Sequence, residues 1–304
     1  MLLCLLLCLS AALALAEDGN ALDRSLDFSL DLSFEKWNDF VYSYTNAAGN
    51  AADLQCSVYI PAAWEQDHHL PLVSFIPDSS LVGKAMNTYK RAACPTKWLS
   101  AEKMNEHPFV MLLIRFTSAS SDVTEAGEES AQIVPIMDQV AERFELDTDR
   151  LYLTGQSMGG IMDFALNDAY PEKFAATVYV GCQMGGDVGD AQYLKILENA
   201  AFAGQKWIYI TSRMDGKAPY GQDDVEQVLI RLGLDYGKLY GLDHEGSEAL
   251  EEQVKAVLDQ GYDRNLLGFT QVTGTGDPAG EHMQSFKYAY AVDAIFDWLM
   301  AQHR

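Results

Sequence analysis

Residues 150–160 read Arg-Leu-Tyr-Leu-Thr-Gly-Gln-Ser-Met-Gly-Gly and are the most informative stretch of the chain. The first five residues have the apolar, β-rich character of a buried strand, and the last two begin a run of helical character. Between them lies Gly-x-Ser-x-Gly, and a strand that runs through this pentapeptide into a helix is the context of a nucleophile elbow. Glycines are needed because strand and helix approach closely around a strained serine. Ser157 is therefore the predicted nucleophile.

Outward from this stretch, short apolar runs alternate with helical stretches, which is typical of a mostly parallel sheet with helices on both faces. Two early strands, 39–44 and 54–60, flank the turn-forming residues 46–50 and are predicted to pair as an antiparallel hairpin. The other expected strands are buried central ones, at residues 72–76, 109–114, 150–154, 177–180, 207–211 and 266–272. The predicted fold class is therefore α/β.

Three helices are expected from apolar residues at helical spacing: 133–144, 159–170 and 281 to about 303. The chain has no internal repeat and no linker rich in Pro, Gly or Ser, so residues 17–304 are predicted to form one catalytic domain. The least regular stretches are 117–127 and 233–263. The second lies before the last expected strand, where a substrate-shaping cap is a reasonable expectation.

The N-terminus has an apolar run from Leu2 to Ala16. As a helix it would cover only about 22 Å of a bilayer core about 30 Å thick. Small residues precede its interruption at Glu17, which predicts a signal peptide of residues 1–16 and a secreted or extracytoplasmic protein without stable membrane insertion after cleavage. Residues 1–16 contain no Lys or Arg. A retained N-terminal anchor is therefore the alternative.

The charge balance excludes one class of partner. The chain has 44 acidic and 21 basic residues, a formal net charge of -23, and would be repelled by nucleic acids. Cys56, Cys94 and Cys182 remain after residue 16 and allow at most one disulfide, whose partners the sequence does not select. No Cys/His cluster, Walker A loop or GxGxxG fingerprint is present, so neither metal nor organic cofactor is expected. The oligomeric state stays open.

A serine nucleophile needs a base, and the base needs an orienting carboxylate. Such groups gather at the carboxyl ends of parallel strands. His282 follows the last expected strand through a Gly-rich loop and is the predicted base, with His244 as the alternative. The remaining histidines precede their strands or end the last helix: His68, His69, His107 and His303.

The predicted carboxylate is Asp215, four residues beyond the strand 207–211 in a turn-rich loop. Asp223 and Asp224 are expected instead to start the next helix. The order Ser157, Asp215, His282 is the nucleophile–acid–base order of α/β-hydrolases.

Three stretches carry a resemblance to a known family: residues 149–160 around Ser157, Tyr-Pro-Glu-Lys-Phe-Ala-Ala at 170–176, and Ile-Phe-Asp-Trp-Leu at 295–299. From residue 70 onward the chain resembles the secreted, lipase-like esterases of the α/β-hydrolase superfamily, close to polyhydroxybutyrate-depolymerase-like and feruloyl-esterase-like proteins. The resemblance implies an α/β-hydrolase fold and a serine carboxylesterase, with aromatic feruloyl or polyester substrates as a refinement.

Two backbone N–H groups are expected to bind the oxyanion, those of Met158 at the helix start and of Ser79. The second rests on the resemblance. Many relatives have His-Gly after the third strand, whereas residues 75–80 read Phe-Ile-Pro-Asp-Ser-Ser. The Asp78 carboxylate would oppose the developing charge unless it points away or is neutralised, for instance by Lys84 or Arg91.

Gln183 and Met184 follow the strand 177–180 and are expected to line an apolar substrate cleft, with core packing as the alternative. The sequence thus predicts an exported serine hydrolase that cleaves carboxylic esters through an acyl-enzyme. One alternative is a prolyl-oligopeptidase-like serine peptidase, disfavoured because no propeller-sized N-terminal domain is present. The other is a non-catalytic binding protein of the same fold, for which Pro77-Asp78 is the best argument.

Overall fold

The computed structural model describes residues 33–118, 127–182, 205–216, 218–242, 247–259, 266–270 and 277–304. The predicted signal peptide, Gln183, Met184 and His244 lie outside these residues. No helix of the described part has both the length and the apolar character that crossing a membrane requires.

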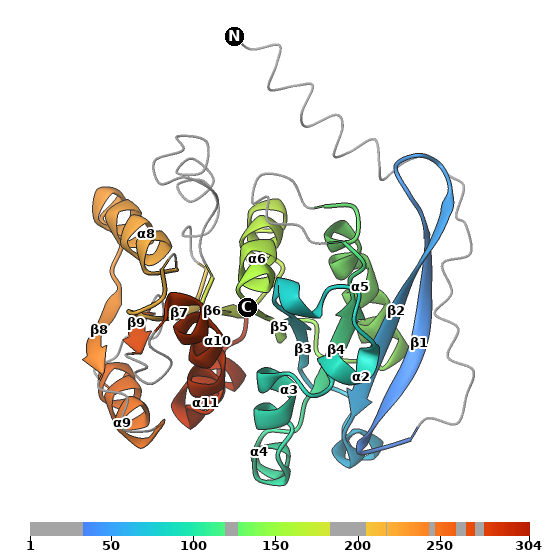
Figure 1. The fold of residues 1–304 in the computed structure, drawn as a ribbon. Coiled ribbons are helices and arrows are strands. Elements are labelled where there is room, and N and C mark those ends of the chain that lie inside the picture. Colours follow the sequence, from blue (N-terminus) through green and yellow to red (C-terminus); the bar gives the residue numbers. More distant parts are fainter. Residues whose placement is uncertain are drawn as a thin grey trace.

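A single mixed sheet of nine strands forms the centre of the described structure, in the order β1-β2-β4-β3-β5-β6-β7-β9-β8 (Figure 1). The strands are β1 (Lys36–Thr45), β2 (Ala51–Ile60), β3 (Leu72–Ile76), β4 (Val110–Arg115), β5 (Leu151–Gln156), β6 (Ala176–Val180), β7 (Trp207–Ser212), β8 (Gly237–Leu242) and β9 (Leu266–Thr270). β2 pairs antiparallel with both β1 and β4, and every other neighbouring pair is parallel. The predicted hairpin and mostly parallel sheet are confirmed.

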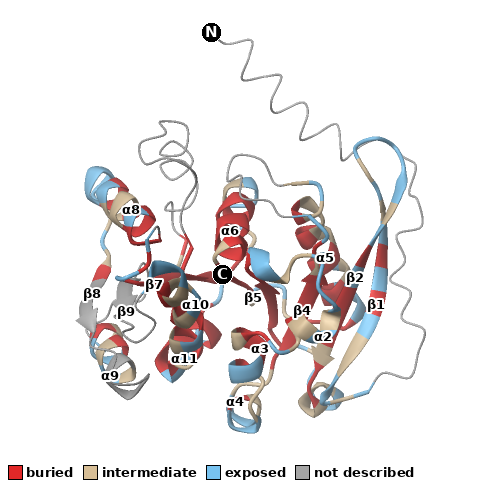
Figure 2. Ribbon diagram, in the orientation of Figure 1, coloured by how far each residue is buried: buried red, intermediate tan, exposed pale blue. Residues whose placement is uncertain are grey.

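Helices cover both faces of this sheet. They are α2 (Met86–Tyr89), α3 (Ala93–Trp98), α4 (Ala101–Glu106), α5 (Ile133–Arg143), α6 (Met158–Ala169), α8 (Ala218–Leu232), α9 (Ser247–Leu258), α10 (Pro278–Ala289) and α11 (Asp293–Met300). In Figure 1, α5, α6 and α8 lie on one face, and α3, α9, α10 and α11 lie on the other. Every residue of β3, β5, β6 and β7 is buried, as Figure 2 shows, because both faces of these strands are covered.

The expectation of an irregular stretch at 233–263 is wrong for the residues that the structure describes there. Most of them form β8 and α9, and β8 extends the sheet by one edge strand beyond β9. The strand is hard to recognise in sequence because Lys238 and Gly241 interrupt its apolar run. Its pairing with β9 is also irregular between Leu239 and Leu242.

The single C-terminal helix expected from residue 281 is also wrong, because the chain forms α10 and α11 with a break at 290–292. Val292 is extended, with φ -83° and ψ 111°, where α11 begins. Tyr290 and Val292 are nevertheless fully buried, so the apolar period continues across the break and conceals it. Asp223 and Asp224 do not start a helix either, since α8 begins at Ala218.

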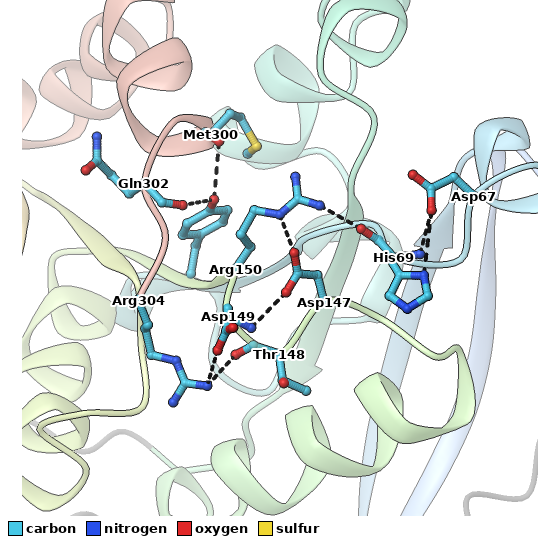
Figure 3. A network of polar contacts seen from close by, with 10 residues as sticks. Asp67, His69, Asp147, Thr148, Asp149, Arg150, Met300, Gln302 and Arg304 are labelled. Atoms are coloured by element: carbon cyan, nitrogen blue, oxygen red, sulfur yellow. Dashed lines mark hydrogen bonds and ion pairs between the residues drawn. The ribbon is translucent and has the colours of Figure 1, made fainter.

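Polar contacts fix the amino end of β5 to the segment before β3 and to the C-terminus (Figure 3). The Arg150 guanidinium donates to Asp147 Oδ2 at 2.6 Å and to the His69 carbonyl at 2.7 Å. The Tyr152 hydroxyl donates to the Gln302 carbonyl at 2.6 Å. Part of the conspicuous 149–152 stretch therefore anchors β5 at the end opposite Ser157.

The three described cysteines, Cys56, Cys94 and Cys182, are buried free thiols. Burial raises the pKa of each thiol above its ordinary value. The sequence allowed one disulfide among these three residues, and the structure has none between them. Each cysteine is packed as a small apolar side chain.

Candidate active site

The turn between β5 and α6 has the backbone geometry that the pentapeptide predicts. Ser157 is alone between the two elements and adopts φ 52° and ψ -117°. A positive φ is uncommon for a residue with a side chain, and such strain persists only where the surroundings enforce it. A Cβ on Gly155 would lie 2.3 Å from the Gly159 carbonyl carbon, so these two glycines let strand and helix cross.

This turn also packs closely against the ends of two neighbouring strands, β3 and β6. A Cβ on Gly159 would lie 2.1 Å from the Ile76 carbonyl oxygen, at the end of β3. A Cβ on Gly160 would lie 2.6 Å from the Cys182 Cβ, just beyond β6. The Ser157 N–H donates to the Val180 carbonyl at 2.9 Å. The position of Ser157 is therefore fixed by β3 and β6 as well as by its own strand and helix.

The structure brings the three predicted residues together. His282 Nε2 lies 2.9 Å from Ser157 Oγ, and His282 Nδ1 forms a hydrogen bond with Asp215 Oδ2. The Asp215 side chain is 4% exposed and the His282 side chain 25% exposed. The carboxylate is thus buried behind an imidazole that solvent reaches.

Local backbone structure positions the acid. Asp215 follows β7, and its N–H donates to the Ser212 carbonyl at 3.1 Å. Its Oδ1 accepts from the Ala218 N–H at the start of α8, at 3.3 Å. One carboxyl oxygen therefore receives a helix N-terminal donor and the other faces His282.

The imidazole is held by α10. The Asp277 side chain caps this helix by accepting from the Gly280 N–H at 2.8 Å, and Pro278 begins it. The Phe286 ring meets the His282 ring edge-on, with centroids 5.0 Å apart. The contact with Asp215 selects the tautomer protonated on Nδ1, so Nε2 is available to accept the Ser157 hydroxyl proton.

Other described histidines pair away from this cluster. His68 Nδ1 lies 3.1 Å from Glu145 Oε2, and His107 Nε2 lies 3.7 Å from Asp297 Oδ1. His244, the alternative base, lies outside the described residues. Among the described residues, no group of three His, Cys, Asp or Glu side chains is arranged to hold a metal ion.

The loop after β3 differs from the expectation in the environment of Asp78. Its side chain is buried, and its Oδ1 accepts from the Ser80 N–H at 2.9 Å while its Oδ2 accepts from Gln156 Nε2 at 2.6 Å. The described Lys84 and Arg91, offered as examples of a neutralising cation, form no ion pair with it, and amide N–H groups bond its two oxygens instead. Sequence reasoning missed Gln156 because nothing local links it to a residue 78 positions away.

The two expected oxyanion donors lie close in sequence to the two residues of the Asp78–Gln156 hydrogen bond, Ser79 next to Asp78 and Met158 two residues after Gln156. Ser79 begins the short 3-10 turn Ser79–Leu81 and is exposed. Met158 begins α6, and the first N–H groups of a helix have no acceptor within it. Within the described residues, the Ser79 N–H also donates to no acceptor. Gln183 and Met184 lie outside the description, and their place in a cleft stays a prediction.

We compared the sequence and the structure with those of known proteins. No protein-family model matches the sequence, and no curated protein is detectably similar to it. Solved structures do match. A thermostable esterase superposes with a TM-score of 0.59 at 17% identity, covering 88% of this chain and 63% of its own. A ferulic acid esterase gives 0.57 at 8% identity, covering 88% and 99%. The chain has the α/β-hydrolase fold.

A third match within the α/β-hydrolase fold is FphF, a fluorophosphonate-binding serine hydrolase of Staphylococcus aureus. Its TM-score is 0.54 at 13% identity, over 86% of this chain and 98% of the other. The chain therefore spans nearly the whole length of two of these proteins but 63% of the thermostable esterase. At these identities the likeness establishes the fold. The activity has to be argued from Ser157 and its neighbours.

Proposed function

We propose that this protein is a serine hydrolase that cleaves carboxylic esters by acyl transfer. The observation that carries the proposal is the position of His282, whose ring bridges Ser157 Oγ, at 2.9 Å, and Asp215. Nucleophile, base and orienting carboxylate then stand in the relation that activates a serine hydroxyl. The names of the three matched structures, two esterases and a serine hydrolase, support the same chemistry.

In the proposed reaction, His282 Nε2 takes the Ser157 proton as Oγ attacks the ester carbonyl carbon. The N–H groups of Met158 and Ser79 bind the resulting oxyanion. The imidazolium, stabilised by Asp215, gives its proton to the departing alcohol, which leaves an acyl-enzyme. Water then attacks the acyl carbon by the same route and releases the acid. Apart from the ester and water, every group that acts in this proposed reaction belongs to the protein chain, and the reaction uses no cofactor.

Substrate and location are finer parts of the proposal. The resemblance of residues 149–160, 170–176 and 295–299 favours aromatic feruloyl or polyester substrates. The apolar run that ends at Ala16 favours export of a single catalytic domain, 17–304. Intact-mass measurement of protein secreted into the medium tests the second point: a chain that begins at Glu17 supports it, and a chain retaining Met1 in the membrane fraction contradicts it.

The nucleophile is tested with a fluorophosphonate probe and peptide mass spectrometry. We expect the adduct on Ser157, and Ser157→Ala is expected to abolish both labelling and hydrolysis of p-nitrophenyl acetate and methyl ferulate. Ser43→Ala is a matched control, because Ser43 lies on β1 and bonds only Asp53, at 2.6 Å, among the contacts described. Full turnover by a folded Ser157→Ala variant would overturn the proposal.

A further inference from the structure

One buried carboxylate joins the two loops that carry the proposed oxyanion donors. Asp78 is 3% exposed and lies in the loop after β3. Its Oδ2 accepts from Gln156 Nε2 at 2.6 Å, and its Oδ1 accepts from the Ser80 N–H at 2.9 Å. Gln156 is itself buried and immediately precedes Ser157. A single side chain thus spans the β3 loop and the nucleophile turn.

Both ends of this bridge are attached to rigid structure. Gln156 is the last residue of β5, in register with Val180 of β6. On the other side, the Pro77 carbonyl oxygen would lie 2.9 Å from a Cβ on Gly159, so the β3 loop packs directly on α6. Movement of Asp78 would therefore move the β3 loop relative to the turn that holds Ser157.

The bridge also determines which donor of the short turn is left for a ligand. The Asp78 carboxylate occupies the Ser80 N–H, and within the described residues the Ser79 N–H has no acceptor. Burying a carboxylate without hydrogen bonds is strongly unfavourable. The two bonds to Asp78 are therefore maintained together, and the Ser79 N–H is held next to them.

We propose that Asp78 is a positioning residue that, through Gln156 and Ser80, fixes the separation between the oxyanion-binding N–H groups of Ser79 and Met158. This inference rests on the proposed function, because it is the oxyanion of the proposed acyl transfer that requires both donors at one oxygen. It also explains how a carboxylate is accommodated in this loop: its oxygens face amide donors of the protein instead of the oxyanion.

Asp78→Ala is expected to lower kcat by about 10- to 100-fold, with KM changed less than about threefold. The reason is that donors held at the right separation act mainly on the transition state, and a misplacement of about 1 Å is costly. The rate of fluorophosphonate labelling is expected to fall in parallel, because phosphonylation also develops charge on an oxygen.

Two side-chain exchanges test the pairing itself. Within the described residues, Gln156 Oε1 is buried and has no hydrogen-bond partner, so rotation of the amide to exchange its two ends breaks only the bond to Asp78. In Asp78→Asn, Oδ1 keeps the Ser80 N–H and Nδ2 donates to the rotated Gln156, so kcat is expected within about threefold of wild type. Gln156→Glu sets two carboxylates against each other and is expected to lose activity. The double variant Asp78→Asn/Gln156→Glu restores an amide–carboxylate pair. Its kcat is expected to be at least tenfold higher than that of Gln156→Glu alone.

The experiment measures kcat and KM on p-nitrophenyl acetate, labelling rate and melting temperature for these variants and for Asp39→Ala. Asp39 is the control because it is a β1 carboxylate that accepts from Ser57 Oγ at 2.6 Å and pairs with Lys90, away from the triad. It is expected to affect stability alone.

Wild-type kcat in folded Asp78→Ala would overturn the proposal, and so would failure of the double variant to improve on Gln156→Glu. If Asp78→Ala does not fold, the comparison of Gln156→Glu with the double variant tests the pairing without it. Failure of the proposed function appears differently, as undiminished hydrolysis by Ser157→Ala.

Discussion

Replacing Gly159 with Ala tests the packing of the nucleophile turn against β3. The added Cβ would lie 2.1 Å from the Ile76 carbonyl oxygen, 2.6 Å from its carbon and 2.9 Å from the Pro77 carbonyl oxygen. All three atoms belong to the backbone, so no side chain can rotate away. The helix and the β3 loop must separate by about 1.3 Å before the shortest contact, at 2.1 Å, reaches the 3.4 Å of an ordinary one.

The magnitude follows from that displacement. Overpacking costs about 1–3 kcal/mol, and a clash with backbone alone belongs at the upper end, about 3 kcal/mol, from which the better helix propensity of Ala removes about 1 kcal/mol. Ile76 is also in register with Gly155, so β3 cannot shift without disturbing its pairing with β5. We expect a loss of roughly 2 kcal/mol in the free energy of unfolding. Because the loop that carries Ser79 moves relative to Ser157, kcat is expected to fall about 100-fold.

Gly233→Ala separates these two effects. Gly233 has φ +65°, and a Cβ there would meet nothing within 4 Å. Ala at this φ costs about 1–2 kcal/mol of stability, but the change lies at the end of α8 and leaves the turn unaltered. Melting temperature and kcat on p-nitrophenyl acetate are measured for both variants. If Gly159→Ala kept both wild-type values, or lost kcat no more than Gly233→Ala does, the packing argument would be refuted.

Three further predictions concern buried groups. Asp215→Asn is expected to lower kcat about 10³- to 10⁴-fold with the fold retained, because the amide favours the wrong His282 tautomer; equal kcat in steady-state assays would contradict this. Burial raises the pKa of Asp163 well above its ordinary value, and neither of its carboxyl oxygens has a hydrogen-bond partner in the part of the chain that the structure describes. The folded chain therefore holds a proton that the unfolded chain releases above about pH 4, and stability falls by up to about 1.4 kcal/mol per pH unit as the pH rises. Asp163→Asn should remove this slope in urea unfolding between about pH 5 and 7, and an unchanged slope would disprove the assignment. Finally, a thiol reagent is expected to find no reactive cysteine in native protein that begins at Glu17 and three in urea, since Cys56, Cys94 and Cys182 are buried; rapid native labelling would show that the packing is looser.

Ser157, Asp215 and His282 could be located from sequence because each has a local signal. The serine lies in a pentapeptide with a strand before it and a helix after it. The other two follow strands, and parallel strands bring their carboxyl ends to the same edge of a sheet. Residues predicted from three separate local patterns are therefore expected to lie together. In the structure they do, and His282 lies between Ser157 and Asp215.

The contact between Asp78 and Gln156 had no such signal. Each residue alone is an ordinary polar side chain near a strand end, and their pairing depends on β3 lying beside β5 in the sheet. Strand order is a tertiary property that hydrophobic periodicity does not contain. For the same reason the sequence suggested Lys84 or Arg91 as partners of Asp78, since only nearby cations could be considered. The break at Tyr290 was concealed differently, because burial continues on both sides of it.

Gly160 shows how far the constraint on the nucleophile turn extends beyond the pentapeptide. The close approach of strand and helix explains Gly155 and Gly159, because a Cβ on the first would collide with the Gly159 carbonyl and a Cβ on the second with the end of β3. Gly160 lies outside Gly-x-Ser-x-Gly, yet a Cβ there would lie 2.6 Å from the Cys182 Cβ and 2.8 Å from its sulfur. The glycine is therefore required by the chain that follows β6, the same segment that leads toward Gln183 and Met184. Since the Ser157 N–H also donates to the Val180 carbonyl of β6, the nucleophile turn is held by contacts with β3 and β6 as well as by its own strand, β5.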